Sequence, residues 1–523
     1  MKKSLSKVWK IGLTLLFGIV VWLFWWLRYP FALSYQEQFQ LFLLDDDYFM
    51  SRMAEPGGLA RYVAEFLVQF YNVVVVGAAI IAVLLVLMQL ITWRLMRSKV
   101  HNPLSIFYYP LSFLPALFVW YMMGDENLLL GFVVSLDIVL AVMLLSLRLN
   151  IWWNILLIVI TYWIAGPLFV ILACWVAGLS LYTQKYTILP VIVCPVVVWL
   201  SSFVSPYPVR VLWGGLGYYR FQGNIPTLKG YKARTYELIE YDYLVRQGRW
   251  DDIIAKADQK SPDLPMSVCA NNLALAMKGE LGERAFDYYQ NGTVGLLPKF
   301  ERNFNSLLVT GEAYFQLGLV NTAQRFAFEA MEAIPNCEKS ARCIRRLAET
   351  NLINGQYDVA RKYLKMLEKT LFYSKWARRT MNLLGNEEAI NQHPLYGHMR
   401  TVRLTDDLLF SDKEIDKICG QLVMQSCTNH VAVQYLLLYP LLQRDINKFM
   451  NYQSFVAERT QYNPRSCQEA VAFAYASRQQ QPPQGAVSPS VLQHFNQFSQ
   501  AYRNHALLEM YKNTVWYYLM EGK

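Results

Sequence analysis

The sequence predicts an all-α protein in two parts, a polytopic bundle of transmembrane helices followed by a solenoid of paired helices. Two observations predict the first part. Apolar residues make up 54% of the 523 and charged residues only 17%, against roughly 25% charged in an average soluble domain, and the long apolar runs are confined to residues 11–204. The second part is predicted from about residue 236 onward, where amphipathic helices alternate with glycine turns.

The first apolar run, residues 11–27, follows a basic start with four lysines. This run is longer than the h-region of a signal peptide, is rich in tryptophan, lacks a small-x-small cleavage site and is followed by more spans. We therefore expect it to remain in place as a signal anchor.

Seven segments are apolar enough to be spans, since crossing about 30 Å of hydrocarbon takes about 20 residues. The fifth and sixth form one apolar run with Gly166-Pro167 at its centre. A proline removes a backbone donor and clashes with the preceding turn, so we expect two short helices that meet near Pro167. A single tilted and kinked helix is the alternative. The predicted spans are residues 9–27, 71–93, 104–123, 128–147, 151–166, 167–182 and 187–204.

Loop charges orient this bundle by the positive-inside rule. The N-terminal segment and the 94–105 loop are basic, whereas the 28–70 segment and the 124–127 turn are acidic and should face out. Seven spans then place the C-terminal half outside too, in the periplasm of a bacterium with this protein in its inner membrane. Six spans, which Arg210 and Arg220 favour, would leave that half in the cytoplasm.

Several function classes find no support in the sequence. The net charge of +10 is spread among acids along the soluble half, so nucleic acid is not an expected partner. No C-x-x-C pair occurs, which argues against a zinc site. No Walker loop, G-x-S-x-G elbow, H-E-x-x-H motif or Rossmann fingerprint occurs either.

The C-terminal half contains helix pairs whose turns are marked by glycines. Four of these glycines recur at intervals near the roughly 34-residue tetratricopeptide period, namely Gly248, Gly279, Gly318 and Gly355. The segments 243–262, 273–289, 311–335 and 347–369 each read as helix, glycine turn, helix, and they resemble tetratricopeptide repeats. Solenoids of this kind present a concave surface, so we expect a protein or peptide partner; the alternative is that the array packs on the membrane domain and binds nothing else. The predicted boundaries are a connector at 205–235, repeats at 236–478, and a linker with terminal helices at 479–523.

Three consecutive aspartates, Asp45 to Asp47, lie in the acidic outer segment, between two amphipathic stretches that are separated by a Pro-Gly-Gly turn. This arrangement resembles the polyprenyl-phosphate-dependent glycosyltransferases of the GT-C fold, which carry an acidic motif in the first outer loop. The resemblance implies that Asp46 or Asp47 is a catalytic base or the ligand of a divalent cation. It also implies that Arg52 or Arg61 lies near the lipid-linked phosphate. The alternative is that the aspartates cap a surface helix and help to fix topology.

Asp137 lies midway along the fourth predicted span. A carboxylate at that depth costs about 2.5–3.5 kcal/mol on insertion scales and is a functional candidate by default. A proton relay or a clamp on a lipid head group would use it, so it joins Asp46 and Asp47 as a candidate catalytic residue. The structural alternative is a hydrogen bond from a neighbouring helix, with Tyr162, Trp163 or Ser112 as the partner.

The stretches at 30–49 and 56–71, followed by a multi-span region and a helical tail, also resemble an uncharacterised bacterial membrane family defined only as a domain of unknown function. We therefore expect an integral membrane protein whose repeats bind a protein or peptide partner at the cell envelope. The alternative is a GT-C-like glycosyltransferase that uses a polyprenyl-phosphate-linked sugar. The alternative requires Asp45 to Asp47 and Asp137 to line one outward-facing cavity, whereas a binding protein leaves these acids scattered.

Overall fold

The structure is a computed structural model that describes residues 2–99, 105–181, 188–215, 217, 219–220, 230–301, 304–334, 338–406, 414–504 and 508–520. The model is 75% helical. Its described residues contain no β-strand, and extended pairing among them is limited to an isolated bridge between Leu128 and Arg220. The predicted all-α class is confirmed.

The chain forms two compact units. The N-terminal unit consists of Met1–Tyr236 together with two later segments, Ile334–Arg342 and Lys365–Arg378. The C-terminal unit consists of Glu237–Ala333, Cys343–Leu364 and Arg379–Lys523. Two short pieces of the C-terminal half therefore fold as part of the unit that contains the apolar helices.

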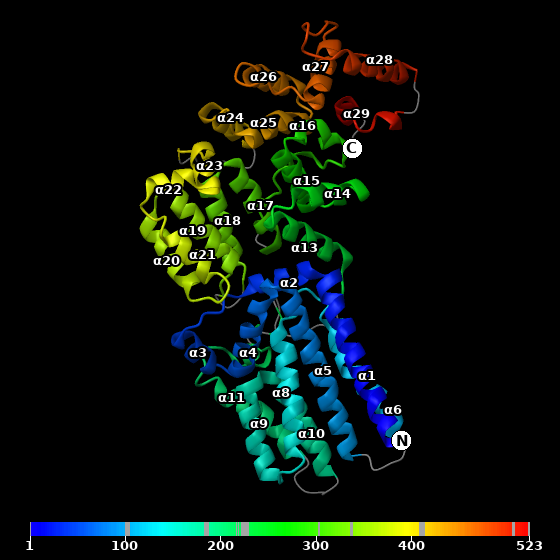
Figure 1. The fold of residues 1–523 in the computed structure, drawn as a ribbon, viewed down its shortest axis with the longest axis vertical. Coiled ribbons are helices and arrows are strands. Elements are labelled where there is room, and N and C mark those ends of the chain that lie inside the picture. Colours follow the sequence, from blue (N-terminus) through cyan, green and yellow to red (C-terminus); the bar gives the residue numbers. More distant parts are fainter. Residues whose placement is uncertain are drawn as a thin grey trace. The chain divides into compact units, whose positions relative to one another are not determined.

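The N-terminal unit is a bundle of lengthwise helices with shorter helices at one end (Figure 1). Neighbouring helices in contact include α1 with α5, α5 with α8, α8 with α9, and α10 with α11. The helices are α1 (Lys2–Leu23), α2 (Pro30–Gln36), α3 (Asp46–Met53), α4 (Gly58–Val68), α5 (Val74–Lys99), α6 (Ser105–Leu111), α7 (Leu114–Met122), α8 (Leu130–Ser146), α9 (Ile151–Ala165), α10 (Phe169–Leu181), α11 (Leu189–Ser201) and α12 (Val209–Trp213). A π-helical turn, η1 (Phe24–Arg28), extends α1.

Three helical stretches in the described residues are long and apolar enough to cross a membrane, namely Val8–Arg28, Val74–Ser98 and Ile151–Leu181. These stretches indicate a membrane protein. Apolar helices that are shorter than a usual span occur at Leu130–Ser146, Leu189–Ser201 and His430–Leu442. The third predicted span is divided between the short helices α6 and α7. The count of seven spans therefore stays a prediction.

The long apolar stretch Ile151–Leu181 is interrupted at its centre. Helix α9 ends at Ala165, a 3₁₀ turn covers Gly166–Leu168, and α10 starts at Phe169. Gly166 has φ 69° and ψ −155°, which takes the chain out of the helix, and Pro167 supplies no backbone donor to continue it. The predicted break into two helices that meet near Pro167 is confirmed.

Several segments that connect the helices of the bundle lie together at one of its ends, where hydrogen bonds join them. The Gln36 side chain donates to the Leu128 carbonyl oxygen at 2.9 Å, the Gly57 amide to the Trp163 carbonyl oxygen at 2.8 Å, and the Tyr219 hydroxyl to the Ala165 carbonyl oxygen at 2.5 Å. The 28–70 segment, the turn between α7 and α8, the break at Gly166 and the segment after α11 therefore meet there.

The other end of the bundle is the basic one. The Lys10 ammonium lies 4.4 Å from the centre of the Trp93 ring, and the Tyr109 hydroxyl donates to the Lys10 carbonyl oxygen at 2.8 Å. The start of α1, the end of α5 and the helix α6 therefore lie together, at the far end of α5 from the 28–70 segment.

The C-terminal unit is a succession of short helices, drawn from green to red in Figure 1. Helices that are neighbours in sequence pack against each other in this unit, for example α17 with α18, α24 with α25, and α25 with α26. The helices, some of which begin or end in the N-terminal unit, are α13 (Ala233–Arg246), α14 (Trp250–Gln259), α15 (Pro265–Lys278), α16 (Leu281–Arg284), α17 (Phe304–Leu317), α18 (Val320–Glu332), α19 (Ala341–Ile353), α20 (Tyr357–Glu368), α21 (Ser374–Met381), α22 (Glu387–Gln392), α23 (Pro394–Val402), α24 (Ile415–Gln425), α25 (His430–Leu442), α26 (Ile446–Ala457), α27 (Arg465–Ser477), α28 (Pro489–Arg503) and α29 (Val515–Met520).

All four glycines predicted to mark turns between paired helices have positive φ, from 64° at Gly248 to 93° at Gly318. Gly318 also lacks room for a side chain, since a Cβ there would lie 2.5 Å from the Val402 carbonyl oxygen. The predicted glycine turns are confirmed. The second pair departs from the prediction, because after Gly279 its second helix, α16, has only four residues.

Candidate functional site

The three aspartates mark the start of a surface helix. Asp45 precedes α3, and Asp46 and Asp47 occupy its first turn with exposed side chains. Negative charge is favourable at this end of a helix, where backbone N–H groups lack helical partners. The carboxylate of Asp45 pairs with the Lys369 ammonium at 2.6 Å. The predicted surface helix is present, but Asp45 at its N-cap position makes no side-chain capping hydrogen bond, so the predicted cap is not found.

A tight turn folds α3 back onto α4. Gly57 has φ 80°, and a Cβ on Gly58 would lie 1.8 Å from the Arg52 carbonyl oxygen, so neither position tolerates a side chain without a shift. The predicted turn at Pro56-Gly57-Gly58 is confirmed. Its consequence is that Arg52 on α3 faces Glu65 on α4.

Glu65 is the centre of a buried charged cluster. Its side chain is 6% exposed and receives the Arg52 Nε and Arg61 Nε donors, each at 2.8 Å. The Tyr48 hydroxyl donates to the same carboxylate at 2.5 Å. Burial alone would raise the pKa of Glu65, but the Arg61 and Arg52 guanidiniums and the Tyr48 hydrogen bond together hold that pKa below its usual value. Glu65 is therefore ionised and fully used in holding α3 against α4.

Glu338 completes this cluster from the later segment of the N-terminal unit. The Arg52 guanidinium donates to both Glu338 oxygens at 3.1 Å, and Arg61 forms an ion pair with the same carboxylate. Arg61 also binds Glu55 at 2.8 Å. Two arginines thus face the three carboxylates of Glu55, Glu65 and Glu338, so the cluster has no excess positive charge to attract a phosphate.

Further contacts attach the other later segment, Lys365–Arg378, to the 28–70 segment. The Tyr373 hydroxyl donates to Glu37 at 2.7 Å, and the Leu44 amide donates to the Lys369 carbonyl oxygen at 2.8 Å. The Phe70 and Phe372 rings lie 5.7 Å apart in an edge-to-face arrangement. Ion pairs, backbone hydrogen bonds and aromatic packing therefore all contribute to this attachment.

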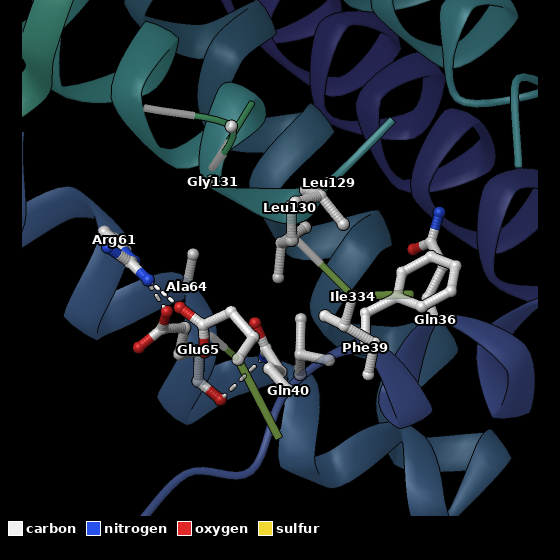
Figure 2. Close-up of a pocket in the computed structure, with 13 residues that line it drawn as sticks. Gln36, Phe39, Gln40, Arg61, Ala64, Glu65, Leu129, Leu130, Gly131 and Ile334 are labelled. Atoms are coloured by element: carbon white, nitrogen blue, oxygen red, sulfur yellow. Dashed lines mark hydrogen bonds and ion pairs between the residues drawn. The ribbon is translucent and has the colours of Figure 1, made fainter. Parts of the chain in front are cut away.

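A pocket adjoins the charged cluster (Figure 2). It has a volume of about 580 Å³, part of it open to solvent. In Figure 2, Arg61 and Glu65 form one charged edge, while Phe39, Leu130 and Ile334 lie on the apolar side. Its lining residues are Gln36, Phe39, Gln40, Arg61, Ala64, Glu65, Val68, Leu129, Leu130, Gly131, Gly217, Ile334 and Glu338.

Asp137 lies away from this pocket, in the middle of α8. Its side chain is buried, and neither carboxylate oxygen has a hydrogen-bond partner among the residues that the structure describes. The Tyr162 hydroxyl pairs with the Ser201 hydroxyl at 2.8 Å, Trp163 donates to the Met53 carbonyl oxygen, and Ser112 donates to the Tyr109 carbonyl oxygen. The structural alternative that one of these three side chains satisfies Asp137 is therefore wrong.

The candidate site residues fall into separate groups. Arg52 and Arg61 lie together, but both are paired with carboxylates. Asp46, Asp47 and Asp137 do not line the pocket beside Arg61 and Glu65. Within the described part of the chain, no cluster of three or more His, Cys, Asp or Glu side chains is arranged to hold a metal ion.

The sequence analysis missed four members of the cluster, Tyr48, Glu55, Glu65 and Glu338. The spacing of Arg61 and Glu65, four residues apart on one helix, was a signal for a pair on the same helix face. Glu338 gave no such signal, because 277 residues separate it from Arg61.

A family model described as a family of unknown function, DUF6057, matches residues 6–522. The chain belongs to the DUF6057 family. The match spans both units, including Asp45 to Asp47 and the Glu338 segment. No curated protein and no solved structure matches the chain.

Proposed function

We propose that this DUF6057 protein is a bacterial inner-membrane protein whose helical C-terminal unit forms a tetratricopeptide-like solenoid that binds a protein or peptide partner at the cell envelope. The observation that carries the proposal is that the arginines of the 28–70 segment form ion pairs with carboxylates, one of which belongs to the C-terminal half. Arg52 and Arg61, the residues that a phosphate would need, are paired with the carboxylates of Glu55, Glu65 and Glu338. The segment is thereby built to hold a piece of the C-terminal half.

The arrangement of the bundle supports seven crossings. The 28–70 segment, the turn after α7, the break after α9 and the chain after α11 share one end, and the start of α1 lies at the other. A chain that enters at one end and leaves at the other crosses an odd number of times. The apolar helices that are shorter than a usual span are long enough to cross the bilayer if its hydrocarbon layer is locally thin or if the helix ends lie near its surface.

Charge supports the orientation of these crossings. The end that holds Lys10 and the basic end of α5 belongs in the cytoplasm by the positive-inside rule. The end that holds Asp45 to Asp47 then faces the periplasm. Because Glu338 and Lys369 bind residues of that same end, the C-terminal half belongs on the periplasmic side.

Contacts between successive helix pairs support the solenoid. Arg346 of α19 pairs with Glu312 of α17 at 2.6 Å, and Asn354 binds Asn321 at 2.7 Å. Phe328 of α18 and Tyr363 of α20 pack edge to face. The pair α17 and α18 therefore contacts the pair α19 and α20, and contacts between neighbouring pairs are how repeat arrays gain stability and an extended binding surface.

A crosslinking experiment tests the partner. Phe328 and Val359 are large apolar side chains that are 40% and 39% exposed, so we would replace each in turn with a photoreactive phenylalanine analogue in the full chain in cells. Arg325, on the same helix α18 as Phe328 and largely exposed, is the matched control. The same adduct from Phe328 and Val359, weaker at Arg325, supports the proposal. Absence of any adduct from probes placed along α14, α18, α20 and α22 contradicts it.

Thiol labelling tests the topology. Single cysteines at Ser51 and Ser477, both exposed, would be tested with a membrane-impermeant reagent after permeabilisation of the outer membrane alone. Cys174 and Cys427 are exposed and Cys337 is not described, so these three are first changed to serine, while the buried cysteines stay in place. Labelling of both sites supports seven crossings. Labelling of Ser51→Cys alone would put the C-terminal unit in the cytoplasm and refute this orientation.

A further inference from the structure

The pocket beside the charged cluster contains polar groups of two kinds. The lining residues named above all belong to the N-terminal unit, and the apolar side of the pocket includes Phe39, Leu130 and Ile334. The polar groups are the charged side chains at one edge and the side-chain amides of Gln36 and Gln40. Which of these polar atoms remain free decides the chemistry of a ligand that fits the pocket.

The charged groups at the edge are occupied by one another. The three nitrogens of the Arg61 guanidinium donate to Glu65, Glu55 and Glu338, and Arg52 donates to Glu338 and Glu65. Three carboxylates against two guanidiniums leave an excess of negative charge, which repels an anionic ligand. The Arg61 guanidinium in the wall opposes a cationic one. This edge therefore favours an uncharged ligand.

Gln36 contributes a free acceptor whose orientation is fixed. The residue is 8% exposed, and its Nε2 donates to the carbonyl oxygens of Leu128 at 2.9 Å and Glu126 at 3.4 Å. Because both of these groups are acceptors, the amide nitrogen lies toward them and Oε1 is turned away. That oxygen accepts no hydrogen bond from the described residues and keeps some accessible surface. Since Gln36 lines the pocket, this surface opens into it (Figure 2).

Gln40 contributes a second free acceptor. Its Nε2 donates to the backbone carbonyl oxygen of Glu65 at 3.3 Å, which again turns Oε1 the other way. No donor among the described residues reaches this oxygen. In Figure 2, Gln40 lies beside Glu65, whereas Gln36 lies beside Phe39. The pocket therefore has two separate, uncharged acceptors next to an apolar wall.

A peptide segment with an apolar side chain has the groups that match this wall. Its backbone N–H groups are uncharged donors that recur along the chain, so that two of them can meet two separate acceptors. Its side chain can pack against Phe39, Leu130 and Ile334, which removes apolar surface from water. Hydrogen bonds to the main chain together with a pocket for a side chain are a recurring mode of peptide recognition.

We propose that this pocket binds a short uncharged peptide segment of a partner protein, with backbone N–H groups donating to Gln36 Oε1 and Gln40 Oε1 and an apolar side chain against the opposite wall. The inference goes beyond the proposed function, because the pocket belongs to the N-terminal unit and does not depend on what the solenoid binds. Absence of adducts from the solenoid would leave it standing.

Isothermal titration calorimetry of the full chain in detergent tests the inference with the uncharged probe N-acetyl-leucyl-leucinamide. The matched probe is the same peptide with every amide hydrogen replaced by a methyl group, so that it keeps the apolar side chains and has no N–H donor. We expect one molecule of the first probe to bind with a Kd of about 1 mM or less. The methylated probe should bind at least about tenfold more weakly, because it cannot donate to the two glutamine oxygens.

Two outcomes of this comparison would overturn the inference. Equal affinity for the two probes would mean that the pocket recognises apolar surface alone. No binding of N-acetyl-leucyl-leucinamide at about 10 mM would mean that the glutamine oxygens bind only water. Both outcomes are measured on the unaltered chain, so neither depends on whether a variant folds.

Two further probes define the side chain and the charge of the ligand. N-acetyl-glycyl-glycinamide keeps the donors but lacks the apolar side chains, and should bind at least about tenfold more weakly than the leucine probe. Leucyl-leucinamide carries a free ammonium and should bind no more tightly than its acetylated form, because Arg61 lies in the wall. Equal binding of the glycine probe, or tighter binding of the ammonium probe, would contradict an uncharged apolar segment.

A variant locates the site. Gln40→Met keeps the length of the side chain but removes the acceptor, and should weaken N-acetyl-leucyl-leucinamide about fivefold, as expected for one uncharged hydrogen bond. Gln69→Met is the matched control, since the Gln69 amide donates to the Phe66 carbonyl oxygen at 3.1 Å and Gln69 does not line this pocket. An equal change in both variants would overturn the inference. Thermal unfolding of Gln40→Met at the wild-type temperature would show that weaker binding is not a loss of fold.

Discussion

The charged cluster predicts that Arg61 is required to hold the segment Ile334–Arg342 against the 28–70 segment. Arg61 is 5% exposed and touches three carboxylates, those of Glu55, Glu65 and Glu338. Arg61→Ala leaves Glu65 buried with Arg52 as its remaining charged partner in the described chain. Removing one member of a buried ion pair typically costs about 3–5 kcal/mol. The acids at the rim, Glu55 and Glu338, are 20% and 14% exposed, so the lower value of about 3 kcal/mol is expected here.

Hydrogen exchange measured by mass spectrometry turns this value into an observable. The exchange rate of a protected amide follows the free energy of local opening, and about 1.4 kcal/mol corresponds to a factor of ten. Amides of α4 and of residues 338–342 should therefore exchange about 100-fold faster in Arg61→Ala. Arg61→Lys keeps the charge but not the multiple donors, and should lie between wild type and Arg61→Ala.

The matched control is Arg249→Ala. Arg249 pairs with Asp252 on the surface, where both side chains are about half exposed, and such pairs contribute about 1 kcal/mol or less. Exchange in α4 and at 338–342 should not change in this control. If Arg61→Ala accelerates exchange in both regions less than threefold, the cluster does not hold the segment and the reasoning fails.

Three further predictions concern pH and the glycine turns. The pKa of Glu65 is depressed in the folded state. The ionised Glu65 carboxylate therefore stabilises the fold above the unfolded pKa of about 4.3, and this stabilisation is lost as pH falls below that value. The difference in amide exchange of α4 between wild type and Glu65→Gln should shrink over the same pH range, and a constant difference down to pH 3 would contradict this. Burial raises the pKa of Glu469 to about 7 despite the neighbouring Arg465. The folded state therefore binds the Glu469 proton more tightly than the unfolded chain, and the free energy of unfolding rises as pH falls from 7 toward 4. In thermal unfolding, Glu469→Gln should be more stable than wild type at pH 8, by up to about 3 kcal/mol, and equal to it near pH 4. Gly318→Ala should destabilise the C-terminal unit by more than about 1 kcal/mol, because Gly318 has a positive φ and lies close to the Val402 carbonyl oxygen. Gly355 also has a positive φ but has open space around it, so Gly355→Ala should destabilise the unit less. Equal melting temperatures for the two variants would refute the steric argument.

The local features of this fold were readable in the sequence. The apolar runs marked the helices of the bundle, Gly166-Pro167 marked the break between α9 and α10, and the turn glycines marked positions of positive φ. Each signal acts over a few residues, through hydrogen bonding, steric restriction or the side-chain period of a helix. Such effects do not depend on the rest of the chain.

The candidate site was only partly predictable from the sequence, because its interactions depend on residues that are far apart in the chain. The aspartates drew attention to the correct segment, but its central interactions belong to Glu65 and to Glu338. Asp137 was expected to bond one of three side chains, and no described residue is its hydrogen-bond partner. A charged side chain is neutralised by whichever group packing brings within a few ångströms, and composition does not specify that group.

The sequence by itself thus determined which segments are helical, where they break and which are apolar enough for a bilayer. Only the tertiary structure decided that Ile334–Arg342 and Lys365–Arg378 fold with the N-terminal unit. Helix formation depends on neighbours in sequence, whereas these contacts join residues as much as 336 positions apart. They exist because burial of apolar and paired charged surface outweighs the entropy of closing such long loops, and that balance is set by the packed fold.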